Sequence, residues 1–255
     1  MGRLEITTHI GCPINCVDCP QALLRTKYCG WTMMDFNDYK KAIDKVPQHV
    51  RIDFSGMCEP FCNPYCAEMI LYAAEKGHPL ALYTTLQGAT EEDYQKLKDV
   101  QYNVTTIHLP DCEGRSTFKI TEQYLRLLQK WPCDNYSCHG QIDPLVWPLL
   151  LPGKSIITFM HDRAGNVEGR PHMQLDPSTP VECVNCGRAL DHNVLLPDGT
   201  VLVCCMDYGM TEVFGNLFYQ SYEEILNSYA AQNLREKMKN QDCLCKKCTN
   251  ARIKN

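Results

Sequence analysis

The sequence predicts an α/β fold, a partial (β/α) barrel of parallel strands followed by a small cysteine-rich domain at the C-terminal end. Three observations lead to this prediction. Segments rich in β-branched and aromatic residues alternate with amphipathic segments of about 10 to 15 residues. This alternation stops near residue 175, and the cysteines with metal-ligand spacing lie near the two ends of the chain.

The alternation begins with an apolar, β-rich segment at residues 4–10. Helix signals are clear in several later segments, for example Thr90 as an N-cap before an acidic first turn. Parallel strands joined by helices bring their carboxyl ends together, so functional loops are expected there. The further strands are predicted at 49–56, 78–86, 103–110, 135–143 and 154–161, and the helices at 34–46, 64–77, 90–100 and 121–131.

The pattern changes in the last third of the chain. Residues 177–187 are expected to be a linker, and residues 193–205 to form a β-hairpin around a Pro-Asp-Gly turn. A helix is expected within the tail. We therefore divide the chain into a partial barrel at 1–175 and a small cysteine-rich domain, a hairpin plus a helix, at 176–255.

Composition limits the possible partners and location. The chain has 255 residues, 44% hydrophobic and 22% charged, which is ordinary for a globular protein. A net charge of −5 argues against broad binding to nucleic acid or to an anionic membrane surface. No apolar run approaches the length of a membrane span, and the start lacks the features of a signal peptide. We expect a cytoplasmic protein with neither nucleic acid nor membrane as a partner.

Seventeen cysteines are many for such a protein, and an odd number cannot all pair within one chain. In a reducing compartment, clustered cysteines indicate metal binding. Cys12, Cys16 and Cys19 form a C-x3-C-x2-C group in "CPINCVDCP". A structural zinc site uses four ligands and a [4Fe–4S] cluster has four irons, so three thiolates leave one coordination position open.

A second set of cysteines lies in the tail, with Cys186, Cys204, Cys245 and Cys248 as the predicted ligands. A hairpin with a cysteine at each end, closed by a C-x2-C turn, can supply four thiolates. The spacing also permits a zinc ribbon. Three neighbours are close enough in sequence to replace one of these ligands: Cys183, Cys205 and Cys243.

The other seven cysteines show no ligand pattern. Cys58, Cys62 and Cys66 recur at every fourth residue, which we interpret as one face of a helix or as chance. His108 and His161 are expected at strand ends that face the active site, where each is either a proton acceptor or a hydrogen-bonded structural histidine. Asp111 and Glu113 lie near His108 and could contact ribose or substrate.

The first cysteine group and the segment "SGMCEP" together resemble radical S-adenosylmethionine (AdoMet) enzymes. In that family three cysteines hold three irons of a [4Fe–4S] cluster and AdoMet binds the fourth iron. The resemblance implies that Gly56 and Glu59 bind the amino group of AdoMet. Two departures leave the adenine and ribose contacts open. Asp18 stands where the family usually has an aromatic residue, and the third strand ends in "YTTLQG".

The late cysteines resemble the twitch domain, the short form of the SPASM extension of these enzymes, which carries one auxiliary [4Fe–4S] cluster. In compact family members an arginine ahead of that domain contributes to the substrate site. Arg163 in "HDRAGN" is its counterpart here. The alternative for Arg163 is a surface arginine in a turn or a clamp between the domains.

The resemblance implies an oxidoreductase with two [4Fe–4S] clusters and AdoMet as cofactors. Such an enzyme cleaves AdoMet to a 5′-deoxyadenosyl radical, abstracts a substrate hydrogen and passes an electron to the auxiliary cluster. The expected substrate is a hydroxyl-bearing small molecule, a sugar or an aminocyclitol, and the expected electron donor is a flavodoxin or ferredoxin. Two alternatives stay open: an enzyme that matures a peptide or protein, and a zinc-binding protein without catalysis.

Overall fold

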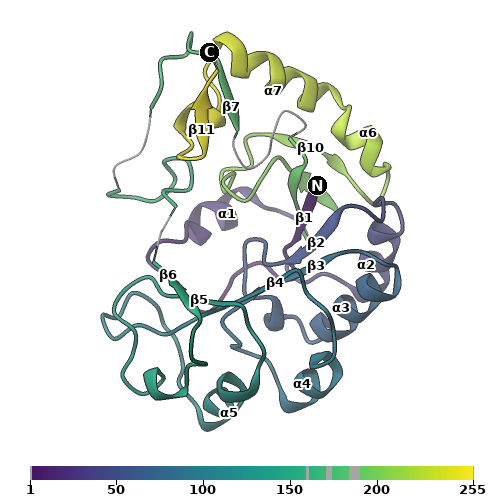
Figure 1. The fold of residues 1–255 in the computed structure, drawn as a ribbon. Helices are drawn as coiled ribbons and strands as arrows, with labels where there is room; N and C mark the ends of the chain where they lie inside the picture. The colour runs from purple at the N-terminus through teal and green to yellow at the C-terminus, as the bar shows by residue number, and fades with distance from the viewer. Residues whose placement is uncertain (1, 159–160, 171–173, 184–189, 255) are drawn as a thin grey trace.

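The computed structural model describes residues 2–158, 161–170, 174–183 and 190–254 (Figure 1). The helices are α1 Gln21–Lys27, α2 Phe36–Ile43, α3 Cys66–Glu75, α4 Glu91–Leu97, α5 Glu122–Lys130, α6 Tyr222–Leu226 and α7 Tyr229–Asn240, with short 3-10 helices η1 Pro60–Cys62, η2 Trp147–Leu149 and η3 Leu244–Lys247. The strands are β1 Arg3–Ile6, β2 Arg51–Phe54, β3 Leu80–Thr84, β4 Val104–His108, β5 Asn135–Ser137, β6 Ser155–Ile157, β7 Val181–Cys183, β8 His192–Leu195, β9 Thr200–Leu202, β10 Val213–Asn216 and β11 Ala251–Ile253.

Strands β1 to β6 are parallel and lie side by side in chain order, which confirms the predicted partial barrel. They belong to a nine-stranded sheet in the order β10-β9-β8-β1-β2-β3-β4-β5-β6. Strand β8 runs parallel to β1, whereas β9 and β10 are antiparallel additions. The sheet therefore takes strands from both sides of residue 175, and the two-domain division remains a prediction.

The alternation of side chains along the strands separates the core from the functional interior. Leu4 and Ile6 of β1 are fully buried in the main hydrophobic core, beneath the helices. Arg3 and Glu5, between and beside them, line cavities on the opposite face of the sheet. Successive strand residues point to opposite faces, so a short strand serves both purposes.

Local sequence signals explain where the helices begin. Thr90 caps α4 in a reciprocal capping box with Asp93, as the sequence predicts. Thr121 caps α5 by accepting a hydrogen bond from Tyr124 N. Helix α1, directly after the first cysteine group, was not among the predicted elements. Its N-cap residue, Pro20, makes no side-chain cap hydrogen bond, so the usual start signal is missing.

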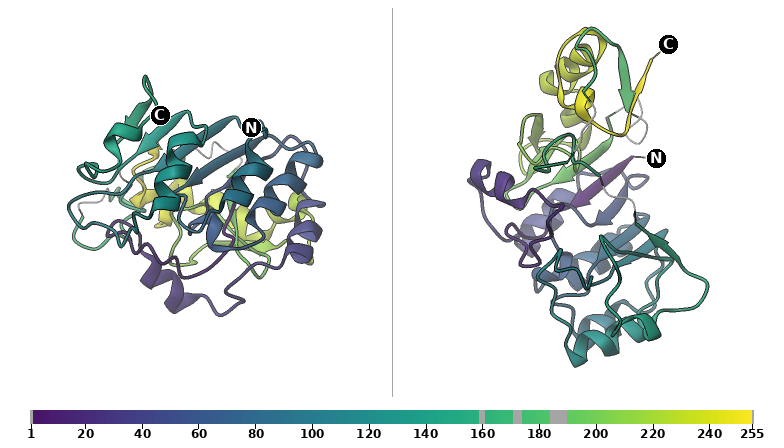
Figure 2. Two further views of the ribbon diagram at one scale, coloured as in Figure 1. Left: turned by 90° about the horizontal axis from the view of Figure 1, so that it is seen from below. Right: turned by 90° about the vertical axis from the view of Figure 1, so that its left-hand side faces the viewer.

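The C-terminal part contains the predicted hairpin, formed by β8 and β9. Gly199 closes its turn with φ +84°, and a Cβ there would lie 2.6 Å from Asn216 Oδ1, so the position requires glycine. The expected linker contains a strand, because β7 pairs antiparallel with β11. Figures 1 and 2 show β7, β11 and α7 together at one end of the molecule, away from α4 and α5.

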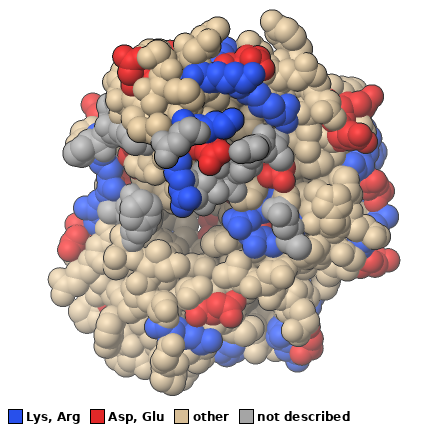
Figure 3. Space-filling view, turned by 45° about the horizontal axis from the view of Figure 1, so that its top comes forward, with Lys and Arg blue, Asp and Glu red and all other residues tan. Residues whose placement is uncertain are grey.

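Among the helices in the described part of the chain, none is long and apolar enough to span a membrane. The face shown in Figure 3 is hollowed near its centre. Basic and acidic side chains are interspersed over this face rather than gathered into regions of one sign.

Candidate functional site

A cavity of about 370 Å³ opens inside the barrel, at the carboxyl ends of the parallel strands. Its wall combines the first cysteine group with residues from β1 to β5 and from the C-terminal part of the chain. This is the place at which the βα topology predicts a functional site. The chemically functional part of the wall consists of Cys12, Cys16, Cys19, Gly56, Cys58, Glu59, Thr84, Thr85, His108, His139, His161, Arg163, Cys205 and Tyr208.

The three cysteines of the first group line this cavity together. They lie on a loop between β1 and α1, in which Cys19 N donates to Cys16 O at 3.0 Å. The pKa values of Cys12 and Cys16 are shifted in opposite directions. A hydrogen bond with the Cys62 thiol lowers the pKa of Cys12 to about 6, whereas burial, with the charges of Cys19 and Cys12, raises that of Cys16 to about 12.

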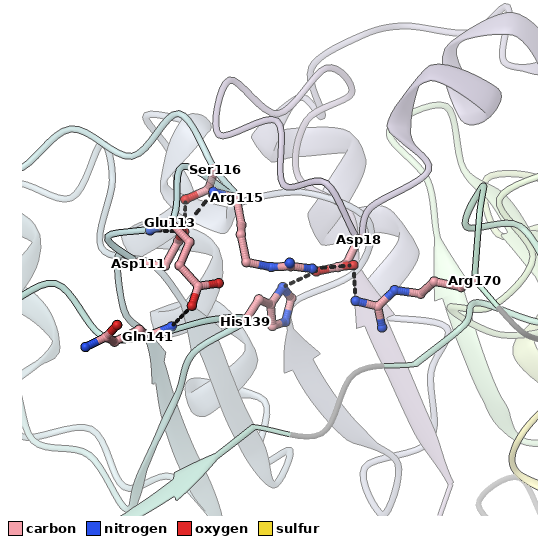
Figure 4. Close-up of polar contacts among 8 residues, drawn as sticks. All are labelled: Asp18, Asp111, Glu113, Arg115, Ser116, His139, Gln141 and Arg170. Atoms are coloured by element: carbon pink, nitrogen blue, oxygen red, sulfur yellow. Dashed lines mark hydrogen bonds and ion pairs between the residues drawn. The ribbon is translucent and has the colours of Figure 1, made fainter.

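Asp18, inside the cysteine loop, is the centre of a charged cluster (Figure 4). Its buried carboxylate accepts from Arg115 Nη2 at 3.0 Å, pairs with Arg170, and lies 3.7 Å from His139 Nδ1. The four residues come from the cysteine loop, the loop after β4, the segment before residue 171 and the end of β5. Asp18 therefore links the cysteine loop to three other segments of the chain.

Glu59 lies at the end of β2 with its carboxylate buried in the cavity wall. Oε1 accepts from Thr84 Oγ1 at 2.6 Å and Phe61 N at 3.2 Å, and Oε2 accepts from Thr85 N and Oγ1, both at 2.6 Å. Burial raises the pKa of Glu59 to about 7, although these hydrogen bonds favour the ionised form. The carboxylate is thus fixed at the ends of two neighbouring strands.

Gly56 starts the same segment and has φ +54°. A Cβ at this position would lie 2.4 Å from Thr7 Oγ1 and 2.7 Å from Thr7 N. Glycine is therefore required for the backbone of β2 to pass close to the end of β1. Met57 N donates to Thr7 Oγ1 at 3.0 Å, and Gln21 Nε2 donates to Met57 O, which fixes the segment further.

Arg163 enters the cavity from the segment that follows β6. It has φ +52°, and Ala164 and Gly165 also have positive φ, so a tight left-handed turn presents the side chain. Arg163 Nη1 donates to Cys205 O at 3.5 Å, and its guanidinium lies 5.8 Å from the centre of the Tyr208 ring. Tyr208 in turn has its hydroxyl 3.5 Å from Cys19 Sγ. Arg163 thus connects the C-terminal part to the first cysteine group.

A second, smaller cavity of about 180 Å³ lies in the C-terminal part. Three of the predicted auxiliary ligands line it together, Cys204, Cys245 and Cys248, and Cys205 also belongs to its wall. The fourth predicted ligand, Cys186, lies outside the described residues. Of the alternatives, Cys243 is buried and its thiol forms a hydrogen bond with the thiol of Cys245. Cys183 lies on β7.

The two cavities share part of their walls. Arg3, Glu5, His161 and Cys205 line both. Glu5 accepts a hydrogen bond from Ser55 Oγ at 3.1 Å and forms a second hydrogen bond with the Cys205 thiol. Burial, together with the charge of Asp53, raises the pKa of Glu5 to about 7. The side chains of these four residues therefore form a wall that the two thiol-lined cavities have in common.

The two predicted histidines lie where they were expected, in the wall of the larger cavity. His108 packs edge to face against His139, with 4.3 Å between ring centroids, and its Nδ1 lies 3.0 Å from Ser137 Oγ. Burial and the neighbouring His139 lower the pKa of His108 to about 3, so its ring is neutral near pH 7. Asp111 instead holds its own loop by accepting from Glu113 N, Arg115 N and Ser116 Oγ (Figure 4).

The donor atoms fit an iron–sulfur cluster at each cavity. Thiols that line a common cavity are the ligands of iron–sulfur clusters, and in the first cavity three of them stand beside further hydrogen-bonding groups. Among residues 2–158, 161–170, 174–183 and 190–254, no three His, Cys, Asp or Glu side chains have the spacing that holds a single metal ion.

Several residues of the site were not predicted from the sequence. Four of them belong to no matched sequence motif: Glu5, Thr84, Thr85 and Tyr208. Each is brought into the cavity wall by strand pairing or by the packing of the C-terminal part against the barrel. A signal for Glu5 existed in the alternation of β1, where a charged residue between two apolar ones must face away from the core. Tyr208 had none, because its contact with Cys19 joins residues 189 positions apart.

Comparison with known proteins adds to this geometry. A family model described as SPASM, an iron–sulfur cluster-binding domain, matches residues 186–249. No curated protein matches the chain by sequence.

Several solved structures share the fold. BtrN in complex with AdoMet and 2-DOIA is 17% identical with TM-score 0.67, over 98% of this chain and 93% of that chain. Streptococcus suis SuiB bound to precursor peptide SuiA is 10% identical with TM-score 0.59, over 96% of this chain and 69% of that chain. Native anSMEcpe with bound AdoMet is 14% identical with TM-score 0.54, over 97% and 86%. The resemblance predicted from the sequence is thus confirmed in two respects: the chain shares the partial-barrel fold of BtrN, SuiB and anSMEcpe, and residues 186–249 match the SPASM iron–sulfur cluster-binding domain.

Proposed function

We propose that the protein is a radical AdoMet oxidoreductase that removes two electrons from a hydroxyl-bearing small molecule, a sugar or an aminocyclitol. The observation that carries the proposal is the pair of thiol-lined cavities with a common wall. One group of thiols faces a cavity large enough for ligands, and the other lies directly behind that wall. An electron leaving a substrate in the first cavity therefore has an acceptor site next to it.

The proposal assigns one [4Fe–4S] cluster to each cavity. Cys12, Cys16 and Cys19 hold the first, and Cys186, Cys204, Cys245 and Cys248 hold the second. When bound, the first cluster supplies the one-electron reductive cleavage of AdoMet, for which a flavodoxin or ferredoxin is the proposed donor.

The chain's own residues bind and orient the ligands. Glu59 accepts a charge-assisted hydrogen bond from the AdoMet ammonium group, and Gly56 lets the backbone approach it. Thr84 and Thr85 hold the Glu59 carboxylate in place. Arg163 orients a substrate hydroxyl between the two groups of thiols, close to Cys205 and Tyr208. The barrel wall excludes water from the reacting carbon.

The polar interior of the larger cavity supports a hydroxyl-bearing substrate. Its wall presents hydrogen-bonding groups from successive strands, and a polyol can use them in place of water. Glu5, with a pKa raised to about 7 by burial, is placed to accept a proton as the hydroxyl carbon is oxidised. The groups that support this reading are Glu5, Ser55, Tyr83, Thr106 and Ser137.

Peptide maturation is the second candidate. It is favoured by the fold shared with SuiB bound to its precursor peptide and with anSMEcpe bound to the Cp18Cys peptide, the latter at TM-score 0.54. Both structures are less than 25% identical to this chain, so the likeness supports the fold rather than the substrate.

The test is a substrate survey with the anaerobically reconstituted protein. AdoMet and a reductant are incubated with aminocyclitols and sugars in one set and with short peptides in another, and 5′-deoxyadenosine and oxidised product are measured by mass spectrometry. We expect a polyol to stimulate AdoMet cleavage and to lose two hydrogens per AdoMet consumed. Stimulation by peptides alone would favour maturation. Absence of AdoMet cleavage in every mixture would contradict both.

A further inference from the structure

The first cavity holds more thiols than the sequence motif assigns to it. Cys58 lines the same cavity as Cys12, Cys16 and Cys19. Cys62 lies beside Cys12 and shares a hydrogen bond with its thiol. The spacing of Cys58, Cys62 and Cys66 suggested one helix face, but Cys58 precedes η1, Cys62 ends it and Cys66 begins α3. The three thiols therefore have different surroundings.

The Cys58 thiol is directed toward the end of β1. Its Sγ lies 3.5 Å from Thr8 Oγ1, and the Thr8 hydroxyl donates to Pro60 O at 2.8 Å. Since the Thr8 proton is used in that bond, the Cys58 thiol is the donor to Thr8. The thiol is near enough to Cys12 for the charges of the two sulfurs to interact. The sulfur is also hydrogen-bonded by the backbone of His9, and hydrogen bonds to thiols are weak, so both can be exchanged at small cost.

The backbone around Cys58 is fixed. Gly56 packs against Thr7. The backbone N–H of Met57 donates a hydrogen bond to Thr7 and its carbonyl accepts one from Gln21. The Glu59 carboxylate caps η1 and accepts hydrogen bonds at the end of β3. This is the segment to which we assign the amino group of AdoMet. A thiol in it is therefore held beside the coordination position that three cysteines leave open.

We propose that Cys58 is a fourth, exchangeable ligand of the first cluster, occupying the open iron when AdoMet is absent and giving way when AdoMet binds. This inference rests on the proposed function. In the exchange, the Fe–S bond to Cys58 forms as its thiol proton passes to solvent. When AdoMet binds, that bond breaks, bonds from AdoMet nitrogen and oxygen to iron form, and Cys58 takes up a proton. No electron is transferred. The exchange protects the open iron from loss between turnovers.

Two consequences can be measured without substrate. An iron held by a protein thiolate is lost less readily on mild oxidation, so the AdoMet-free cluster keeps its fourth iron. Cys58 also competes with AdoMet: if the thiolate occupies the iron about nine-tenths of the time, it weakens AdoMet binding about tenfold.

The test compares Cys58→Ser and Cys58→Ala with the native chain, and Cys66→Ala is the matched control. Serine preserves the contact with Thr8 but is a poor iron ligand, which guards against a folding defect in the alanine variant. Cys66 is a buried thiol of the hydrophobic core eight residues further on. The AdoMet dissociation constant is measured by titration. The fraction of three-iron cluster after limited ferricyanide oxidation, without AdoMet, is measured by EPR.

We expect both Cys58 variants to bind AdoMet several-fold more tightly and to form more three-iron cluster, while Cys66→Ala matches the native protein. Mössbauer spectra of ⁵⁷Fe-loaded native protein without AdoMet should show all of the iron, about eight per chain, in all-sulfur coordination, and one iron that departs from it in the Cys58 variants. Identical behaviour of the Cys58 variants and the native protein would overturn the inference, as would the same effects from Cys62→Ala alone. If the native protein has a cluster that responds to AdoMet but the Cys58 variants behave like the native protein, this inference fails and the proposed function stands. A native protein with no cluster contradicts both.

Discussion

The two thiol-lined cavities of this protein differ in how they are built and in what can reach them. The first is about twice the volume of the second, 370 against 180 Å³, and its cysteines are partly exposed on one short loop. In the second, Cys245 and Cys248 are 8% and 7% exposed and lie near Cys204, about forty residues earlier in the chain. The first group is local and open, whereas the second, the enclosed group, is assembled from distant segments, with two of its three described thiols buried.

The difference suggests a division of labour. An open group of three thiols beside a fixed carboxylate suits a cluster that must bind a small ligand through an iron. An enclosed group suits a cluster whose irons are all held by the protein and that exchanges only electrons. Three residues that line both cavities, Glu5, His161 and Cys205, place the two sites next to each other.

The largest effect is expected from the open group. Replacing Cys12, Cys16 and Cys19 together by Ala removes every ligand that the motif assigns to the first cluster. AdoMet cleavage to 5′-deoxyadenosine should be abolished while about half of the iron remains. Chromatographic assay of 5′-deoxyadenosine and colorimetric iron analysis measure the two results. Cys112→Ala, at an exposed cysteine, is the control and should change neither. Continued AdoMet cleavage by the triple variant would show that this loop does not hold the cluster.

The enclosed group should give a different pattern. Replacing Cys245 and Cys248 by Ala should also halve the iron but preserve AdoMet cleavage, because the first cavity is intact. Formation of oxidised product should stop, since the electron acceptor is gone. Product and 5′-deoxyadenosine are quantified in the same reaction to give the coupling ratio. If the double variant still forms product in proportion to 5′-deoxyadenosine, the second site is not the acceptor.

A smaller effect is expected at Glu59. Glu59→Ala removes the proposed partner of the AdoMet ammonium, and a charge-assisted hydrogen bond of about 1.5–3 kcal/mol corresponds to roughly 10- to 150-fold weaker binding. The same change leaves the donors of Thr84 and Thr85 without their acceptor, so stability also falls. Thr84→Val is the matched control, because it removes one of these donors and keeps the carboxylate. Equal AdoMet affinity in Glu59→Ala and the native chain would refute the assignment.

The smallest effect is expected at Asp18, whose carboxylate links the cysteine loop to three other segments of the chain. Asp18→Asn keeps the shape but removes the charge that pairs with Arg115 and Arg170. The arginines are about a quarter to a third exposed, so solvent compensates in part and the loss of stability should be about 1 kcal/mol. Urea unfolding of the cluster-free chain measures it. We also expect weaker iron retention in the first site only. Equal iron loss from both sites would mean that Asp18 serves general stability.

Most of the barrel was readable from the sequence because its elements are locally determined. Thr90 and Thr121 are N-cap residues that mark the starts of their helices. The strands, rich in β-branched residues, alternate with the helices along the chain and follow the same order in the sheet. Strand β7 was missed because three residues between prolines and cysteines carry little periodicity. Its partner β11 lies about seventy residues away.

The site divides in the same way. Cys12, Cys16 and Cys19 were predicted from their spacing, and Gly56 and Glu59 from the resemblance of "SGMCEP" to a family motif; both groups lie within a few residues of a strand end. The contact of Tyr208 with Cys19 and the common wall at Glu5 and Cys205 depend on how β8 docks beside β1. No local pattern encodes that docking. Cys58 was dismissed for a related reason, since a four-residue spacing predicts a helix face and the prolines and the Glu59 cap prevent a continuous helix there.

The central claim is that two different clusters occupy the two cavities and that only the first responds to AdoMet. It is tested most directly by anaerobic purification with iron and sulfide analysis, followed by EPR of the reduced protein with and without AdoMet. We predict about eight irons and eight sulfides per chain, and two overlapping EPR signals of which AdoMet changes one. A colourless protein that contains zinc, or a single signal indifferent to AdoMet, would contradict the account.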